Sequence, residues 1–299
     1  MGVSVITKKF SEDKIFNIII YTIAVMIMII VLYPLIFVVS ASFSEPTKIL
    51  SGEVWLYPKG FTFDAYAQVF QDGRIWNSYK NTVVYTVLGT FINLVLTTLL
   101  AYPLSRKDLP GRNIFMLIIV FTMFFQGGII PTYLIVQNLE MIDTIWAMVI
   151  PNAIATYNVI VMRTFFQSSI PWELQEAALI DGCGDFKLFL KIIIPLSKPI
   201  IAVMVLFYAV GHWNSYFDAL IYLDRDRLYP LQIILREILI QNQSAMENAV
   251  MDFEMVNQVM LAESMKYAVI VIASLPVIVM YPFVQKHFVK GVMIGSIKG

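Results

Sequence analysis

The feature that most constrains this chain is a series of six apolar stretches, each long enough to cross a lipid bilayer. A helix needs about 20 mostly apolar residues to span the hydrocarbon core, where every backbone polar group must be satisfied within the segment. We therefore predict an all-α membrane protein with six transmembrane helices. The predicted spans cover residues 15–40, 79–104, 113–137, 142–166, 199–222 and 267–287.

The composition agrees with a multi-pass membrane protein. Hydrophobic residues make up 59% of the 299 residues and charged residues only 14%, whereas soluble domains carry about 25% charged residues. The formal net charge is +0, which gives no sign of a nucleic-acid partner. Cys183 is the only cysteine, so the chain cannot form an internal disulfide.

The charges of the short loops predict the orientation. The loop with Arg106, Lys107 and Arg112 is basic, which is typical of the cytoplasmic side. The short loop with Glu140 and Asp143 has no lysine or arginine and suits the outside. Both termini are then expected to be cytoplasmic, in the plasma membrane of the cell. The predicted parts are a cytoplasmic segment 1–14, a transmembrane domain 15–290 with outer loops 41–78 and 223–266 and an inner connection 167–198, and a cytoplasmic tail 291–299.

Several common catalytic and nucleotide sites are missing from the sequence. There is no Walker A pattern to hold nucleotide phosphates, and His212 and His287 are not part of an H-E-x-x-H metal site. A structural or interfacial role is expected for both histidines. Cys183 has no base nearby in sequence and is interpreted as a small residue between two glycines. No catalytic residue, metal site or cofactor is therefore predicted in this chain.

Ionisable residues are scarce inside the predicted spans. Asp218, near the outer end of the fifth span, and Arg163, at the inner end of the fourth, are the nearest cases. Ion-coupled transporters usually hold carboxylates or histidines at mid-membrane depth, so the scarcity indicates that a partner supplies the energy. Two other classes stay open: an ion- or proton-coupled transporter, and a membrane-embedded enzyme that would be active as the purified chain alone.

The inner connection 167–198 begins with a predicted short helix in "SSIPWELQEAALIDG". Ser169 is expected to cap this helix, with Pro171 in its first turn. Gly182 is expected to end it in the left-handed conformation. Three residues are expected to share one face of the helix, at a spacing of three and four: Leu174, Ala177 and Ala178.

A second, amphipathic helix is predicted after Gly182. Its apolar stripe contains Phe186, Phe189, Leu190 and Ile193, and its other face carries Lys187, Lys191 and Lys198. A helix that only anchors the loop to lipid headgroups would explain this second element. It would not explain the small residues and the glycine break of the first helix.

The spacing across this segment resembles the cytoplasmic motif of ABC importer permeases, which is Glu-Ala-Ala, three residues, Gly, nine residues, Ile, one residue and Leu-Pro. This chain has Glu176-Ala177-Ala178, Gly182, Ile192 and Ile194-Pro195 at these positions, with Ile194 in place of leucine. Asp181 before the glycine matches the carbohydrate-uptake branch, whereas Cys183 replaces the alanine usual there.

The resemblance extends over nearly the whole chain. The segments "LYPLIFVVSASFS", "GGIIPTYLIVQNLEMIDTIWAMVIPN", "GHWNSYFDALIYL" and "YPFVQKHFVKGVMIGSIKG" are similar to those of MalG-like oligosaccharide permeases. Within that group, the LplC/YtcP type of Gram-positive bacteria resembles the chain most. The resemblance implies a type I importer fold and a transport subunit that is not an enzyme. The alternative is a permease of this type for another solute, such as a peptide or a modified sugar.

The resemblance also implies partners and site residues. The partners would be a second homologous permease, two ATPase subunits that bind ATP and magnesium, and an extracellular lipoprotein that delivers the oligosaccharide. The residues that contact the ATPases would be Glu176, Ala177, Ala178, Asp181, Gly182 and Pro195 in the coupling region, and Gly291, Gly295 and Ser296 in the tail.

Sugars are bound by aromatic faces and amide groups, so the spans offer candidates for a substrate path. These candidates are Tyr157, Asn158, Trp213, Asn214 and Tyr216, with Asn93 as a further amide. The same side chains could instead join helices or anchor them at the headgroup level. In maltose-type transporters the partner permease can carry most of the sugar contacts.

Overall fold

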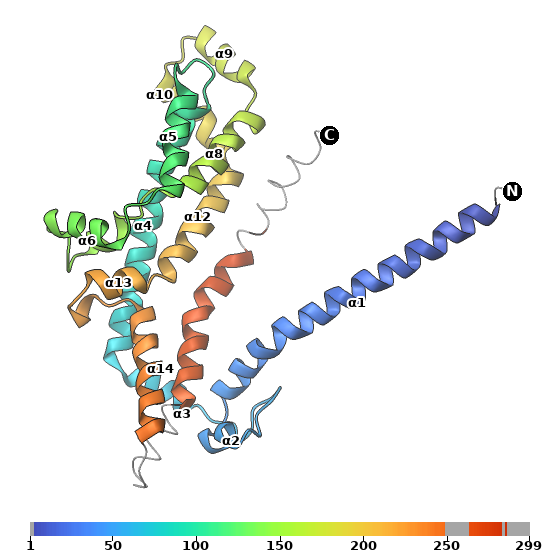
Figure 1. Cartoon of the computed structure of the whole chain (residues 1–299), viewed down its shortest axis with the longest axis vertical. Helices are drawn as coiled ribbons and strands as arrows, with labels where there is room; N and C mark the ends of the chain where they lie inside the picture. Colours follow the sequence, from blue (N-terminus) through green and yellow to red (C-terminus); the bar gives the residue numbers. More distant parts are fainter. Residues whose placement is uncertain (1–2, 249–262, 283–284, 286–299) are drawn as a thin grey trace. The chain divides into compact units, whose positions relative to one another are not determined.

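The computed structural model describes residues 3–248, 263–282 and 285, and this part of the chain is helical without strands (Figure 1). The all-α fold class is therefore confirmed. The helices are α1 (Val3–Ser42), α2 (Pro46–Leu50), α3 (Asp64–Gln71), α4 (Gly73–Ser105), α5 (Arg112–Phe124), α6 (Ile129–Asn138), α7 (Ile145–Val149), α8 (Thr156–Ser169), α9 (Trp172–Ile180), α10 (Asp185–Leu188), η1 (Phe189–Ile193), α11 (Ile194–Leu196), α12 (Lys198–Trp213), α13 (Phe217–Tyr222), η2 (Asp226–Leu228) and α14 (Leu231–Asn248). A last helix covers Glu263–Pro282.

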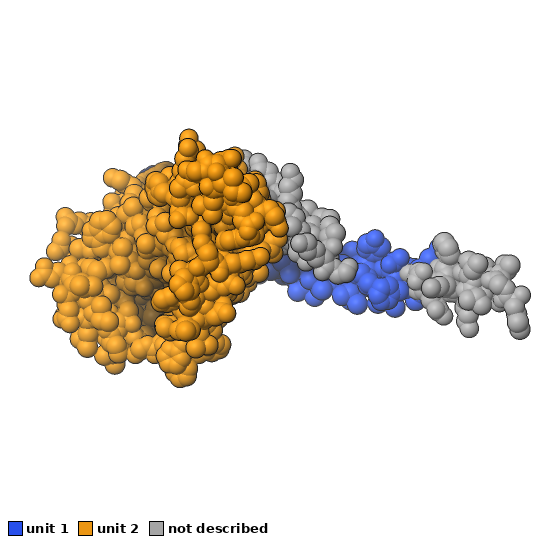
Figure 2. Space-filling model, turned by 90° about the horizontal axis from the view of Figure 1, so that it is seen from above, with its two compact units in different colours: residues 1–71, 238–272 blue, residues 72–237, 273–299 orange. Residues whose placement is uncertain are grey.

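The chain divides into two compact units, coloured separately in Figure 2. One unit combines residues 1–71 with 238–272, and the other combines residues 72–237 with 273–299. In the first unit, Ala41 at the end of α1 packs with Ile49 and Val54. Phe37 meets the ring of Tyr267 edge to face, with 5.7 Å between ring centroids. This cluster joins α1, the loop after it and the last helix.

The second unit is built around α4, which packs against α12, α8, α7 and α5. Small and hydroxyl-bearing residues on α4 let α12 approach closely. A Cβ added at Gly89 would overlap the imidazole of His212 on α12. About two turns further along α4, the hydroxyls of Thr97 and of Tyr208 on α12 are 2.6 Å apart and hydrogen-bonded. These contacts fix how α4 and α12 are aligned.

The described residues contain three helices long and apolar enough to cross a membrane, within α1, at α4 and at Glu263–Pro282. Two bent pairs, α5 with α6 and the α10–α11 segment with α12, raise the number to five if each pair is one span. The predicted sixth span, 267–287, reaches beyond the described residues. The remaining predicted spans are present as shorter, interrupted helices.

The interruptions have local causes. The predicted span 113–137 bends by 109° between α5 and α6, next to Gly128, which has a φ of 86°. The span 142–166 is divided into α7 and α8 by an irregular stretch that contains Pro151. The span 199–222 breaks between Trp213 and Phe217. Each break lies at polar, glycine or proline residues inside a mostly apolar stretch, namely Gln126 to Gly128, Pro151 with Asn152, and Asn214 with Ser215. The mean hydropathy of a whole span does not reveal such short breaks.

The close approach of α4 and α12 generates a stability prediction. Gly89→Ala should lower the free energy of unfolding by about 1–3 kcal/mol, because the added methyl group displaces His212 from a packed interface. Gly211→Ala is the matched control, since no atom lies within 4 Å of a Cβ at that position. The measurement is the thermal unfolding midpoint in detergent. Equal midpoints for the two variants would contradict this account of the interface.

Candidate functional site

The end of α9 has the geometry predicted for Gly182. Its φ is +72°, in the left-handed region that favours glycine. The Gly182 N–H donates to the carbonyl of Leu179 at 3.0 Å, and the Cys183 N–H donates to the carbonyl of Ala178 at 2.9 Å. This pattern is a Schellman motif, which satisfies carbonyls at the helix end. The glycine therefore ends α9 sharply and reverses the chain.

The predicted start of α9 is wrong. Ser169 is the last residue of α8, and α9 begins at Trp172 with Pro171 as its N-cap and without a side-chain cap. The cause is Ile170, which is extended with φ −111° and ψ 107°. A residue before proline is sterically disfavoured in the helical region, so the two helices cannot run together.

The two faces of α9 differ from the prediction. Ala178 and Gln175 are buried against the rest of the unit, whereas Ala177 is exposed, so Leu174, Ala177 and Ala178 do not share one environment. The exposed side chains of α9 are a mixture of apolar residues with Glu173 and Glu176. Leu174 is 40% exposed, Leu179 44% and Ile180 86%. Exposed apolar side chains beside charged ones on a short helix are typical of a docking surface.

The Glu176 side chain is oriented within α9. The indole N–H of Trp172 donates to its carboxylate at 2.7 Å, four residues away on the same face. This contact holds the carboxylate along the helix surface. Trp172 was not predicted as a functional residue, although its spacing of four from Glu176 places both on one side of a helix.

The segment after Gly182 is not one regular amphipathic helix. A π-helical turn, η1, separates α10 from α11, and Pro195 is the second residue of α11. The buried residues are Leu188, Phe189 and Ile193, while Phe186 is 74% exposed and Leu190 47% exposed. Of the predicted stripe, Phe189 and Ile193 are therefore buried, whereas Phe186 and Leu190 are exposed.

Arg106 connects this segment to the inner end of α4. Its guanidinium donates to Asp185 at 2.8 Å and to Asp108 at 2.6 Å, and it also donates to the hydroxyl of Tyr102 at 3.2 Å. The Arg106 side chain is only 11% exposed. Hydrogen bonding from Arg106 lowers the pKa of the Asp108 carboxyl, so this carboxylate stays ionised at neutral pH. Tyr102 in turn packs on Phe189, with ring centroids 4.9 Å apart.

The candidates for a substrate path separate into buried and exposed residues. Asn158 and Trp213 are buried, and so is Asn93. Tyr157 is 56% exposed, Tyr216 is 46% exposed and Asn214 is exposed as well. The Asn214 amide donates to the carbonyl of Val210 at 2.9 Å within its own helix. Tyr157, Asn214 and Tyr216 are thus exposed on this chain, whereas the other three candidates are packed inside it.

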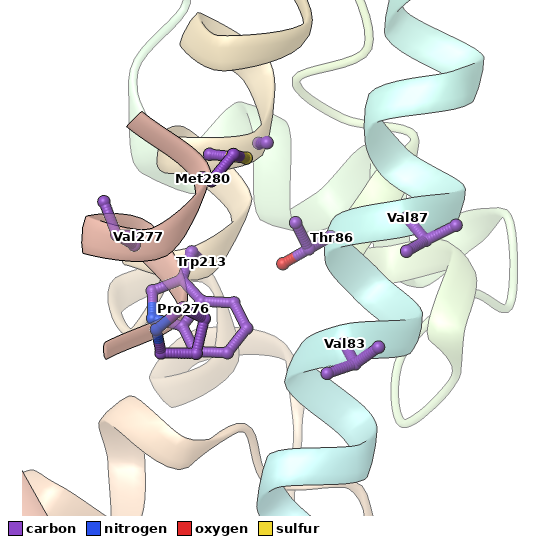
Figure 3. Close-up of a pocket in the computed structure, with 8 residues that line it drawn as sticks. Val83, Thr86, Val87, Trp213, Pro276, Val277 and Met280 are labelled. Atoms are coloured by element: carbon purple, nitrogen blue, oxygen red, sulfur yellow. The ribbon is translucent and has the colours of Figure 1, made fainter. Parts of the chain in front are cut away.

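Trp213 joins helices. Its indole N–H donates to the carbonyl of Ala273 at 2.9 Å, and its ring meets Tyr79 edge to face at 5.6 Å. Figure 3 shows it beside a cavity of about 140 Å³, with Pro276 and Val277 of the last helix on one side and α4 on the other. The cavity wall is almost entirely apolar, which does not suit a sugar. The tail residues Gly291, Gly295 and Ser296 lie outside the described residues.

Comparison with known proteins gives a consistent result. The family described as "Binding-protein-dependent transport system inner membrane component" matches residues 72–294. The polygalacturonan/rhamnogalacturonan transport system permease protein YtcP of Bacillus subtilis is 42% identical, over 96% of this chain and 100% of the relative. Protein LplC of the same organism is also 42% identical, over 90% of each chain.

A solved structure is similar over almost the whole chain. It is a chain of a bacterial ABC transporter involved in the import of the acidic polysaccharide alginate. The TM-score is 0.83 at 34% sequence identity, and the match covers 93% of this chain and 98% of that chain. The similarity therefore includes both the helices and the connections between them.

The Arg106 contacts generate a local prediction. Arg106→Gln should speed amide hydrogen exchange at residues 185–188 by about fivefold, because a charged hydrogen bond to Asp185 is lost. Arg74→Gln is the control, since Arg74 forms a comparable but exposed ion pair with Asp72. Unchanged exchange at 185–188 in Arg106→Gln would show that this segment is held without the ion pair.

Proposed function

The chain belongs to the family of binding-protein-dependent transport system inner membrane components, and from this premise we propose that it forms part of the import path for an oligosaccharide. Members of this family are permease components of ABC transporters and are not enzymes themselves. Such a component works with a partner permease, an ATPase and a binding protein. The proposal that the solute is an oligosaccharide is supported by the relatives, whose names include polygalacturonan, rhamnogalacturonan and alginate.

The proposed assembly has one further permease, two ATPase subunits that bind ATP and magnesium, and an extracellular binding lipoprotein. Both termini are cytoplasmic in this proposal, and the tail 291–299 reaches between the ATPases. The basic loop that contains Arg106, Lys107 and Arg112 supports this orientation, because it lies at the same end of the unit as α9.

The single observation that carries the mechanism is the construction of α9. It carries exposed apolar and acidic side chains, its end is fixed by Gly182, and Glu176 is held by Trp172. We assign it as the coupling helix that docks on an ATPase. An ATPase that closes on α9 moves a preformed rigid element, so little of the motion is lost in local rearrangement.

Motion of α9 can reach the membrane by two routes. One route follows the polypeptide from α10 through η1 and Pro195 into α12. The axis of the α10–α11 segment and the axis of α12 meet at an angle of 79°. The other is the contact of Arg106 with Asp185, which transmits force to the inner end of α4. Because α4 and α12 also pack against each other, both routes act on one pair of helices.

Glu176→Lys and Gly182→Pro should abolish uptake and transport-coupled ATP hydrolysis while the protein still inserts into the membrane. The lysine reverses the charge held by Trp172, and proline cannot adopt the φ of +72°. The control is Glu53→Lys, the same charge reversal in the loop after α2. Uptake by both α9 variants should fall to the background level of cells without the transporter, whereas Glu53→Lys should keep normal uptake. Normal uptake by either α9 variant would refute the coupling assignment.

The residues after α12 give a separate prediction for the substrate path. Asn214→Ala and Tyr216→Ala should raise the half-saturation concentration for uptake by several-fold, because both side chains are exposed and suited to sugar. Trp213→Ala should instead lower the free energy of unfolding by about 3–5 kcal/mol, because a buried and hydrogen-bonded side chain is lost. This change would be seen as a lower unfolding midpoint. If the first two variants keep normal rate and affinity, this segment is not in the path.

A further inference from the structure

The loop between α2 and α3 exposes a group of large apolar side chains, and we call residues 53–63 the aromatic loop. The side chains that are between 55% and 64% exposed within the chain are Trp55, Leu56, Tyr57, Phe61 and Phe63. Single exposed apolar residues are common on soluble surfaces, whereas a group of them in one short loop is typical of an interaction surface. The coupling mechanism proposed above uses none of these residues.

The aromatic loop is folded back on the end of α1. The Glu45 N–H donates to the carbonyl of Lys59, and the Thr62 N–H donates to the carbonyl of Phe43, both at 3.0 Å. The Lys59 N–H also donates to the hydroxyl of Ser44 at 3.0 Å. The loop is therefore tied at three points to the first residues after α1, and Figure 1 shows α2 and this loop at the end of that helix.

The conformation of the loop is fixed by close contacts. Gly60 has a φ of +62°, and a Cβ at this position would lie within 2.9 Å of two atoms of the Glu45 side chain. The ring of Phe61 stacks on that of Phe43, with centroids 5.7 Å apart, and meets Phe63 edge to face at 5.1 Å. The exposed rings are thus presented by a preformed structure.

The length of α1 sets the depth of this loop. At a rise of about 1.5 Å per residue, the 29 residues of the candidate span Lys14–Ser42 are about 43 Å long. A bilayer with its headgroups is about 40–45 Å thick. When Lys14 lies at one headgroup region, Ser42 therefore lies at the other, and the aromatic loop is tied to the residues that follow it.

The chemistry of the loop suits the headgroup region. Tryptophan and tyrosine are enriched there because an apolar ring and a polar edge can both be satisfied. The indole N–H of Trp55 donates to the carbonyl of Gly52 at 3.0 Å, which leaves the rest of its ring exposed. The Lys59 Nζ atom lies over the ring of Tyr57, 4.6 Å from the centroid, as a cation beside an interfacial aromatic residue.

We propose that the aromatic loop lies in the headgroup region of the bilayer and anchors the end of α1 there. The stretch of α1 from Lys14 to Ile36 is exposed and makes little contact with the rest of the chain, so its depth needs a constraint of this kind. The lipid-covered surface of α1 then continues into the exposed rings of the loop. The inference requires α1 to be a membrane span and holds for either orientation and for any solute.

The experiment measures the depth of spin labels in the complete transporter, reconstituted in lipid nanodiscs with partner subunits that lack cysteine. Cys183→Ala removes the only cysteine of this chain. Labels are then placed singly by Trp55→Cys and Phe61→Cys, each of which leaves the other aromatic side chains in place. The matched control is Ser51→Cys, which is exposed beside the ion pair of Lys48 with Glu53.

Oxygen concentrates in the bilayer, whereas a nickel chelate stays in water. The ratio of oxygen to nickel accessibility should be several-fold higher at positions 55 and 61 than at position 51. Equal ratios at the three positions would overturn the proposal. Labels at 55 and 61 that become protected only when the extracellular binding protein is added would also overturn it, because the loop would then be a protein docking surface.

The anchoring role is tested with a label at Val39→Cys, an exposed position near the end of α1. Trp55→Ser combined with Phe61→Ser should change the accessibility ratio at this label, because α1 is no longer held at its depth. Phe186→Ser is the control, since it removes an exposed phenylalanine from the other compact unit. An unchanged ratio in the double variant would refute the anchoring role.

Discussion

The close packing of α4 on α12 is the contact on which the rest of the larger unit depends. It requires a residue without a side chain at Gly89 and polar contacts such as that of Thr97 with Tyr208. Inside a bilayer such polar contacts replace the hydrophobic effect as the source of specificity. Because α8, α7 and α5 also pack on α4, the alignment of this one pair sets the position of Arg106 and of the segment it holds.

The sequence predicted those parts of the structure that follow from local chemistry. The left-handed Gly182 was predictable because few other residues adopt that conformation, and the apolar lengths predicted helices. The start of α9 was missed because the restriction that Pro171 places on Ile170 outweighed a plausible cap. The contact of Arg106 with Asp185 could not be predicted, since the two residues are 79 positions apart and only the fold brings them together.

The regular and irregular parts of the chain have different roles in the proposed mechanism. Continuous helices such as α4 resist deformation. In the proposed mechanism, changes in backbone conformation are confined to a few residues, at the π-helical turn before Pro195 and at the bend at Ser197. A rigid α9 joined to such a segment converts a push into a rotation of α12. The family of the chain indicates which kinds of partner it has. The geometry of α9 and of the segment after it explains how an ATPase partner acts on α12 in this proposal.

In α1 the apolar stretch from Lys14 to Ile36 is exposed throughout, and the buried residues of this helix are Ser40, Ala41 and Ser42 at its end. Its side chains were therefore selected for surroundings that this polypeptide does not provide. Substitutions there change contacts with lipid or with a neighbouring subunit and leave the packing within this chain unchanged. In two transporters with nearly identical cores, this helix is accordingly where evidence of different assembly partners should accumulate.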